Sequence, residues 1–291
     1  MQAGAYQPFF RGHAHHDAKR REPWMFGEET MVRLRKAAMA RYALLPFWYT
    51  IFREAGETGM PVMRAMWMQY PSTESLYAVD DQFLIGSDLL VKPVTSAGIT
   101  HSIIRFPADD TWYDAESLTV VSKHGQQGQV NEITVPSDLD TIPVFQRGGS
   151  IIPRKLRLRR SSHTMTRDPY TLYIALDSTG YACGALYMDD ENTFNHVNIA
   201  EYANAEFTAN LKGSTGYIRN AVELGSGWNA KAEESNRMIE RIIVMGVEKH
   251  PSAVDEVGET LGFTHDSNTQ ILIIRKPQLS ASAEWEIKIA F

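Results

Sequence analysis

Apolar positions recur at helical spacing in one long stretch near the start of the chain. Between Glu28 and Glu57 they are three or four residues apart, which places them on one face of an α-helix. Glu28 and Glu29 stand where a helix N-terminus favours negative charge, and Pro46 is expected to kink or split the helix. The apolar face comprises Met31, Leu34, Ala38, Tyr42 and Leu45.

Shorter apolar runs follow this predicted helix. Gly59 and Pro61 end it, and the mostly apolar run 62–68 predicts a buried parallel strand. A short helix over 72–79 comes next, and then two strands that flank Gly86. Alternation of strands and helices is the repeating pattern of an α/β barrel.

Beyond about residue 91 the pattern changes to short apolar runs separated by Gly, Pro, Asp and Ser, with no long helix between them. This pattern predicts antiparallel β-sandwiches. A polar, basic stretch near 154–168 separates two sets of such runs. We therefore expect an α/β part over 1–88, a proximal sandwich over 89–166 and a distal sandwich over 167–291.

Charge and composition remove several functional classes. The 29 Lys and Arg residues against 35 Asp and Glu give a net charge of −6, so the chain lacks the basic field that nucleic-acid binders use. The longest apolar stretch, 37–52, is interrupted by Arg41 and Pro46, so no membrane insertion is predicted. Cys183 is the single cysteine, so no internal disulfide can form.

The densest chemical cluster in the sequence is Arg11-Gly12-His13-Ala14-His15-His16-Asp17. One hypothesis is a zinc site formed by His13, His15 and Asp17, because imidazole and carboxylate are zinc ligands. A second is that these are histidines of a surface loop. A third places the cluster at the C-terminal end of a barrel strand over 7–11, where side chains face the substrate. The residues alone leave all three open.

Five ordered motifs resemble the retaining α-glucosidases of glycoside hydrolase family 31. Residues 7–15 with 20–24 are similar to the seventh-strand region of their barrel, 61–67 to the eighth strand, 81–94 to the barrel exit, 142–153 to the proximal sandwich and 186–194 to the distal one. The resemblance implies the C-terminal portion of a TIM (β/α)8 barrel followed by two antiparallel β-sandwich domains.

The resemblance also implies which residues act. Family members cleave by double displacement with two aspartates, a nucleophile and an acid/base, on earlier barrel strands. Neither motif occurs in this sequence, so no catalytic residue is expected here and the chain is expected to be a C-terminal fragment. His13 is expected to bind the substrate. The residues expected to support the site or to border its entrance are Arg11, Asp17, Arg21 and Trp24. Neither a metal nor an organic cofactor is expected.

The form of the first motif is most similar to family members that trim glucose from N-glycans in the endoplasmic reticulum. It implies hydrolysis of terminal α-linked glucose from N-glycan-type oligosaccharides and a location in the lumen of that compartment. The expected partners are an N-terminal fragment that carries the rest of the barrel and a regulatory β-type subunit. The alternative is a non-catalytic carbohydrate-binding or interaction module built on the two sandwiches.

One acidic pair in the distal motif calls for a separate interpretation. Asp189 and Asp190 are adjacent, so on a strand they would point to opposite faces and could not readily share a proton. We predict that they stabilise a turn. Glu191 follows them where the family usually has glycine, which leaves the type of turn open.

Overall fold

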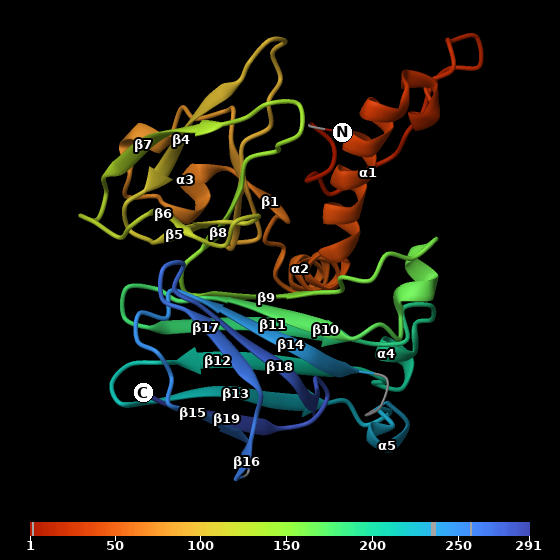
Figure 1. Cartoon of the computed structure of the whole chain (residues 1–291). Helices are drawn as coiled ribbons and strands as arrows, with labels where there is room; N and C mark the ends of the chain where they lie inside the picture. The colour runs from red at the N-terminus through yellow and green to blue at the C-terminus, as the bar shows by residue number, and fades with distance from the viewer. Residues whose placement is uncertain (2, 234–236, 257) are drawn as a thin grey trace.

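The computed structural model of the chain describes residues 1, 3–233, 237–256 and 258–291. Its helical segments are η1 (Pro23–Phe26), α1 (Glu28–Ala43), α2 (Leu45–Thr58), α3 (Met66–Gln69), η2 (Glu74–Leu76), η3 (Ser162–Met165), α4 (Asn195–Asn198) and α5 (Ala230–Glu233). No described helix combines the length and the apolar character that a membrane crossing requires. The remaining elements are strands, so the fold is dominated by β-sheet (Figure 1).

The long predicted helix is present but divided. α1 ends at Ala43, and α2 begins at Leu45 with Pro46 in its first turn. Proline has no N–H to donate to the carbonyl four residues before it, and its ring collides with that carbonyl, so the helix breaks there. The prediction that Pro46 splits the helix is confirmed. α2 ends at Thr58 and is capped by Gly59, which adopts the left-handed conformation that favours glycine.

Two segments predicted as parallel barrel strands form no parallel ladder. Residues 7–11 are irregular, and within 62–68 only Met63–Arg64 (β1) is a strand. β1 pairs antiparallel with β2 (Phe83–Ile85). A parallel strand is held by hydrogen bonds to its neighbours, and no described strand pairs in parallel with either segment. Both strand predictions are therefore wrong in this structure.

The first β-rich part packs a six-stranded sheet against a two-stranded one. The larger sheet has the order β1-β2-β3-β8-β5-β6, and β4 pairs with β7. Phe106 and Phe145 meet edge to face between the two sheets, with ring centroids 4.8 Å apart. The new strands are β3 (Leu89–Val91), β4 (His101–Pro107), β5 (Trp112–Asp114), β6 (Val120–Ser122), β7 (Val130–Pro136) and β8 (Val144–Arg147).

The second β-rich part is one eleven-stranded sheet that folds over on itself (Figure 1). Its order is β16-β15-β19-β13-β12-β11-β9-β10-β14-β18-β17. Phe207 of β12 and Leu272 of β18 belong to one buried cluster although their strands lie in opposite halves of the sheet. The strands are β9 (Ser150–Arg154), β10 (Tyr170–Ala175), β11 (Tyr181–Met188), β12 (Ala203–Asn210), β13 (Thr215–Leu224), β14 (Met238–Met245), β15 (Ala253–Glu256), β16 (Glu259–Thr260), β17 (Phe263–Asp266), β18 (Ile271–Ser280) and β19 (Trp285–Ala290).

Strand pairing crosses both expected domain limits. β2 pairs with β3 across residue 88, and β9 pairs with β10 across the basic stretch before residue 166. β10 and β14 are parallel, so the distal sandwich is not wholly antiparallel. The limits at 88 and 166 stay a prediction, since a hydrogen-bonded sheet need not end at a domain boundary.

α2 lies across the distal sheet and joins it to the N-terminal part. Phe47, Trp48 and Ile51 are buried on one face of α2, in a cluster that also contains Ile85 of β2 and Ile152 of β9. Burying side chains of this size stabilises a fold by about 1.5–3 kcal/mol each. α2 is therefore the element that fixes the start of the chain relative to the distal sheet.

Candidate functional site

The residues predicted to contact or support the substrate all lie on the irregular segment and η1 that precede α1 and project beyond it, away from the sheets (Figure 1). The guanidinium of Arg11 stacks over the Phe9 ring at 5.6 Å. His13 makes no hydrogen bond or ion pair with any described residue. All five candidates are exposed: Arg11, His13, Asp17, Arg21 and Trp24. They share a segment, but no contact joins His13 to the other four.

Arg41 attaches the start of this segment to the helices. Its guanidinium donates hydrogen bonds to the carbonyl oxygens of Ala5 at 2.8 Å and Gln7 at 2.6 Å, and it lies over the Phe10 ring at 5.2 Å and the Trp48 ring at 4.8 Å. Burial lowers the pKa of Arg41. The sequence analysis did not assign this function to Arg41, although one arginine within an apolar helical stretch was the available signal.

The structure brings together a different imidazole group from the one predicted for zinc. Ligand atoms of His15, His16 and Asp17 lie within 4.8 Å of one another, and the predicted member His13 is outside this group. Asp17 is 3.5 Å from His15 Nδ1 and 3.2 Å from His16 Nε2, and all three side chains are at least 70% exposed. A metal-binding histidine normally donates its other ring N–H to an acceptor that fixes the ring, and the described residues supply none here.

The acidic turn of the distal motif behaves as predicted. Asp190 accepts hydrogen bonds from the backbone N–H groups of Asn192 and Thr193, and Asp189 accepts one from Glu191 N–H at 2.8 Å. Hydrogen bonds from Thr193 hold the pKa of Asp190 below its usual range. Glu191 has φ 59°, so it adopts the left-handed conformation that the usual glycine would occupy without strain. The turn prediction is confirmed.

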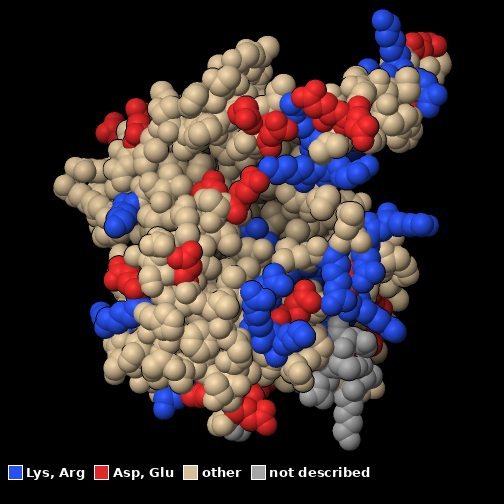
Figure 2. Space-filling view, in the orientation of Figure 1, with Lys and Arg blue, Asp and Glu red and all other residues tan. Residues whose placement is uncertain are grey.

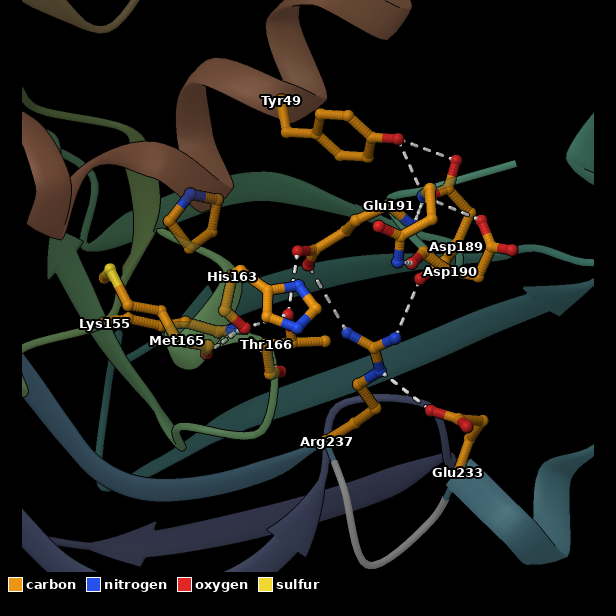
Figure 3. A network of polar contacts seen from close by, with 12 residues as sticks. Tyr49, Lys155, His163, Met165, Thr166, Asp189, Asp190, Glu191, Glu233 and Arg237 are labelled. Atoms are coloured by element: carbon orange, nitrogen blue, oxygen red, sulfur yellow. Dashed lines mark hydrogen bonds and ion pairs between the residues drawn. The ribbon is translucent and has the colours of Figure 1, made fainter. Parts of the chain in front are cut away.

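A polar network connects this turn to α2 (Figure 3). The Tyr49 hydroxyl, from α2, donates to the buried Asp189 carboxylate with 2.8 Å to each oxygen. Arg237 donates to the Asp189 carbonyl at 2.8 Å and to the Glu233 carboxylate at 3.1 Å, and its Nη1 is 3.8 Å from Glu191. Burial, followed by the hydrogen bond to Asp189, raises the pKa of Tyr49. Sequence analysis missed this network because its members come from distant segments.

Basic and acidic groups are mixed on the face that carries α1 and α2. Figure 2 shows Lys and Arg side chains interspersed with Asp and Glu there rather than forming an uninterrupted basic field. Arg33 on α1 pairs with Asp140 at 2.9 Å, and Lys36 pairs with Glu116 at 2.7 Å. Carboxylates therefore neutralise cations on this face.

Comparisons with known proteins show which family domains these elements match. The pattern described as the Glycosyl hydrolases family 31 TIM-barrel domain matches residues 1–51, and the Glycosyl hydrolase family 31 C-terminal domain matches residues 59–152. The first match contains the exposed segment with His13, the whole of α1 and the first half of α2. The second contains the strands from β1 to β8 and the start of β9.

Relatives extend the match to nearly the whole chain. The neutral alpha-glucosidase AB of Mus musculus is 41% identical over 99% of this chain, which spans 30% of that relative. A crystal structure of a glucosidase II alpha subunit with bound Tris has a TM-score of 0.84 and 32% identity, covering 100% of this chain and 32% of that one. An ER glucosidase II heterodimer, with its catalytic subunit and the binding domain of its regulatory subunit, has a TM-score of 0.83 at the same identity and coverage. The chain therefore belongs to glycosyl hydrolase family 31, and it carries sequence from the family's TIM-barrel domain followed by its C-terminal domain.

Proposed function

We propose that this chain is the C-terminal part of a retaining exo-α-glucosidase similar to glucosidase II, which hydrolyses terminal α-linked glucose from N-glycan-type oligosaccharides. The observation that carries the proposal is the match to the glucosidase II alpha subunit structure over the whole of this chain, together with 41% identity to neutral alpha-glucosidase AB over 99% of it. The chain spans about 30% of its curated relatives. The activity therefore belongs to a larger assembly to which this part contributes.

Double displacement needs two carboxyl groups about 5–5.5 Å apart, one on each side of the scissile bond. Near His13 the carboxylates of the segment are Asp17, which faces two histidines, and Glu22, which pairs with Arg20 at 2.9 Å. Hydrogen bonds from Arg20 hold the pKa of Glu22 below its usual range, which is unsuitable for a general acid. We therefore assign the nucleophile and the acid/base to the remainder of the barrel.

His13 is proposed to bind the sugar in the cleavage subsite. A neutral imidazole can donate one hydrogen bond and accept another, which suits two sugar hydroxyl groups. The imidazole is exposed and has no partner among the described residues, so both ring nitrogens are available. Arg11, Asp17, Arg21 and Trp24 share its segment and are proposed to support the site or border its mouth.

Two further assignments rest on the glucosidase II relatives. We propose a regulatory β-type subunit as a partner, in line with the heterodimeric structure that matches the whole chain. We also propose the lumen of the endoplasmic reticulum as the location, because that matching complex is described as an ER enzyme. The polypeptide with the rest of the barrel is the second proposed partner.

The test is to produce the chain together with the polypeptide that carries the preceding barrel strands and to measure glucose release from 4-nitrophenyl α-D-glucopyranoside. We expect activity from the pair and none from either polypeptide alone. His13→Ala should lower kcat/KM by roughly 10- to 100-fold, because hydrogen bonds to the sugar are lost. The matched control is His163→Ala, which replaces an exposed histidine of η3 and should leave the rate unchanged. An active chain without its companion, or an unchanged rate for His13→Ala, would contradict the proposal.

A further inference from the structure

A cavity of about 310 Å³ lies between α2 and the distal sheet. Trp48 of α2 lines it and also belongs to the buried cluster that contains Ile85 of β2 and Ile152 of β9. Its walls include Tyr49 and Phe52 from α2, Lys155 and Ser162 from the segment after β9, and Glu191 from the acidic turn. In Figure 3 the Tyr49 hydroxyl points toward Asp189, whereas Lys155 and Glu191 extend from separate elements toward Thr166. The volume is at the lower end of the range for small-molecule sites.

The cations around the cavity are already held by the protein. Lys155 is buried, and its Nζ donates to the carbonyl oxygens of Met165 at 3.0 Å and Thr166 at 2.9 Å, without an ion pair to any described carboxylate. Arg237 is held by Glu233 and the Asp189 carbonyl. These positive charges disfavour a cationic ligand, and the Lys155 ammonium also lies over the Tyr170 ring, with Nζ 4.7 Å from the ring centroid.

The Glu191 carboxylate, which lines the cavity, makes only weak contacts. One carboxylate oxygen accepts from Thr166 Oγ1 at 3.3 Å, and the other is 3.8 Å from Arg237 Nη1, beyond hydrogen-bond distance. A carboxylate has about four acceptor sites, so most of its capacity is free. A ligand with hydroxyl donors satisfies Glu191, whereas an anionic ligand would be repelled by it.

The walls opposite these polar groups are aromatic. Tyr49 and Phe52 are three residues apart on α2, so they lie on one side of the helix, and they remain 38% and 46% exposed. The backbone of Glu191 is in the left-handed region, where a non-glycine residue is strained, and such strain is concentrated at functional sites. A mostly apolar wall with a few converging polar groups is the arrangement of a ligand site.

We propose that this cavity binds one ring of a neutral saccharide. A pyranose has an apolar face that packs on Tyr49 and Phe52, and its hydroxyl groups donate hydrogen bonds to the Glu191 carboxylate. A simple anion has no such donor, and a simple cation is disfavoured by Lys155 and Arg237. The site lies on a different part of the chain from His13, and it does not depend on the proposed hydrolysis.

The test is saturation-transfer difference NMR on the full chain with methyl α-D-glucopyranoside, titrated to about 20 mM, because weak sugar sites have millimolar dissociation constants. We expect saturable binding, with Phe52→Ala and Glu191→Gln each weakening it about tenfold. Phe52→Tyr keeps the ring and should bind normally. The matched control is Phe194→Ala, which removes an exposed phenylalanine outside the cavity and should bind like wild type.

One further arm identifies the ligand chemistry. Glucuronate should bind more weakly than the neutral glucoside because its carboxylate meets Glu191. Absence of saturable binding, or unchanged binding in both Phe52→Ala and Glu191→Gln with circular dichroism showing folded protein, would also overturn it.

Discussion

The backbone at Glu191 gives a direct test of the distal turn. In the left-handed region, with φ 59°, a residue that carries Cβ costs about 1–2 kcal/mol more than in the right-handed region, whereas glycine does not. Glycine loses about 0.4–1 kcal/mol more conformational entropy on folding than alanine does. The two effects oppose each other, so Glu191→Gly should be more stable than Glu191→Ala by roughly 1 kcal/mol.

The side chain of Glu191 contributes separately from its backbone. Its contact with Arg237 is 3.8 Å and the carboxylate is 36% exposed, so solvent screening limits the ion pair to about 0–1 kcal/mol. The wild type should exceed Glu191→Ala by no more than this amount. Comparing alanine with glycine removes the carboxylate from both variants and so isolates the backbone term.

The assay is urea denaturation followed by tryptophan fluorescence and circular dichroism. With a slope of about 1–3 kcal/mol/M, the glycine variant should have a midpoint roughly 0.3–1 M above that of the alanine variant, with an unchanged slope. Gly59→Ala is the control, because Gly59 also has a positive φ and a Cβ there would meet no neighbour. It should lower the midpoint by a similar amount. Equal midpoints for Glu191→Ala and Glu191→Gly would refute the reasoning.

Three further outcomes are expected. Tyr49→Phe should lower the free energy of unfolding by about 1.5–3 kcal/mol in the same assay, because the buried Asp189 carboxylate loses a donor; a change below the error would contradict this. Hydrogen bonds from Arg159 lower the pKa of Asp168, so the stabilisation they give is complete above the ordinary aspartate pKa and is lost as the pH falls below about 4. Asp168→Asn should therefore flatten the decline of the melting temperature in that pH range. A pH profile unchanged by the substitution would count against this ion pair. The glucosidase activity of the reconstituted enzyme should be insensitive to EDTA, both in the wild type and with alanine at His15 and His16 together. Loss of the wild-type activity in EDTA and its recovery with zinc would support the metal hypothesis instead.

The candidate site could be predicted only in part. The motif around His13 was readable because local residue types at fixed spacing carry the family resemblance. The position of His13 relative to the catalytic acids could not be predicted, because the proposed acids belong to other barrel strands. The attachment of its segment by Arg41, and of α2 by Tyr49, joins residues up to 140 positions apart, and no local pattern encodes such pairs.

The sequence by itself determined the local elements of this protein. Helical spacing and Pro46 defined a split helix, alternating apolar runs defined most strands, and the Asp189–Asp190 pair defined a turn, because each depends on neighbouring residues and on which side chains avoid water. Only the tertiary structure decided how these elements pair. β1 pairs antiparallel with β2, and β9 joins the distal sheet, because a strand takes its hydrogen bonds from whichever strands the folded chain places beside it. The same holds for Glu191, whose left-handed backbone is imposed by the turn around it rather than by its own preference.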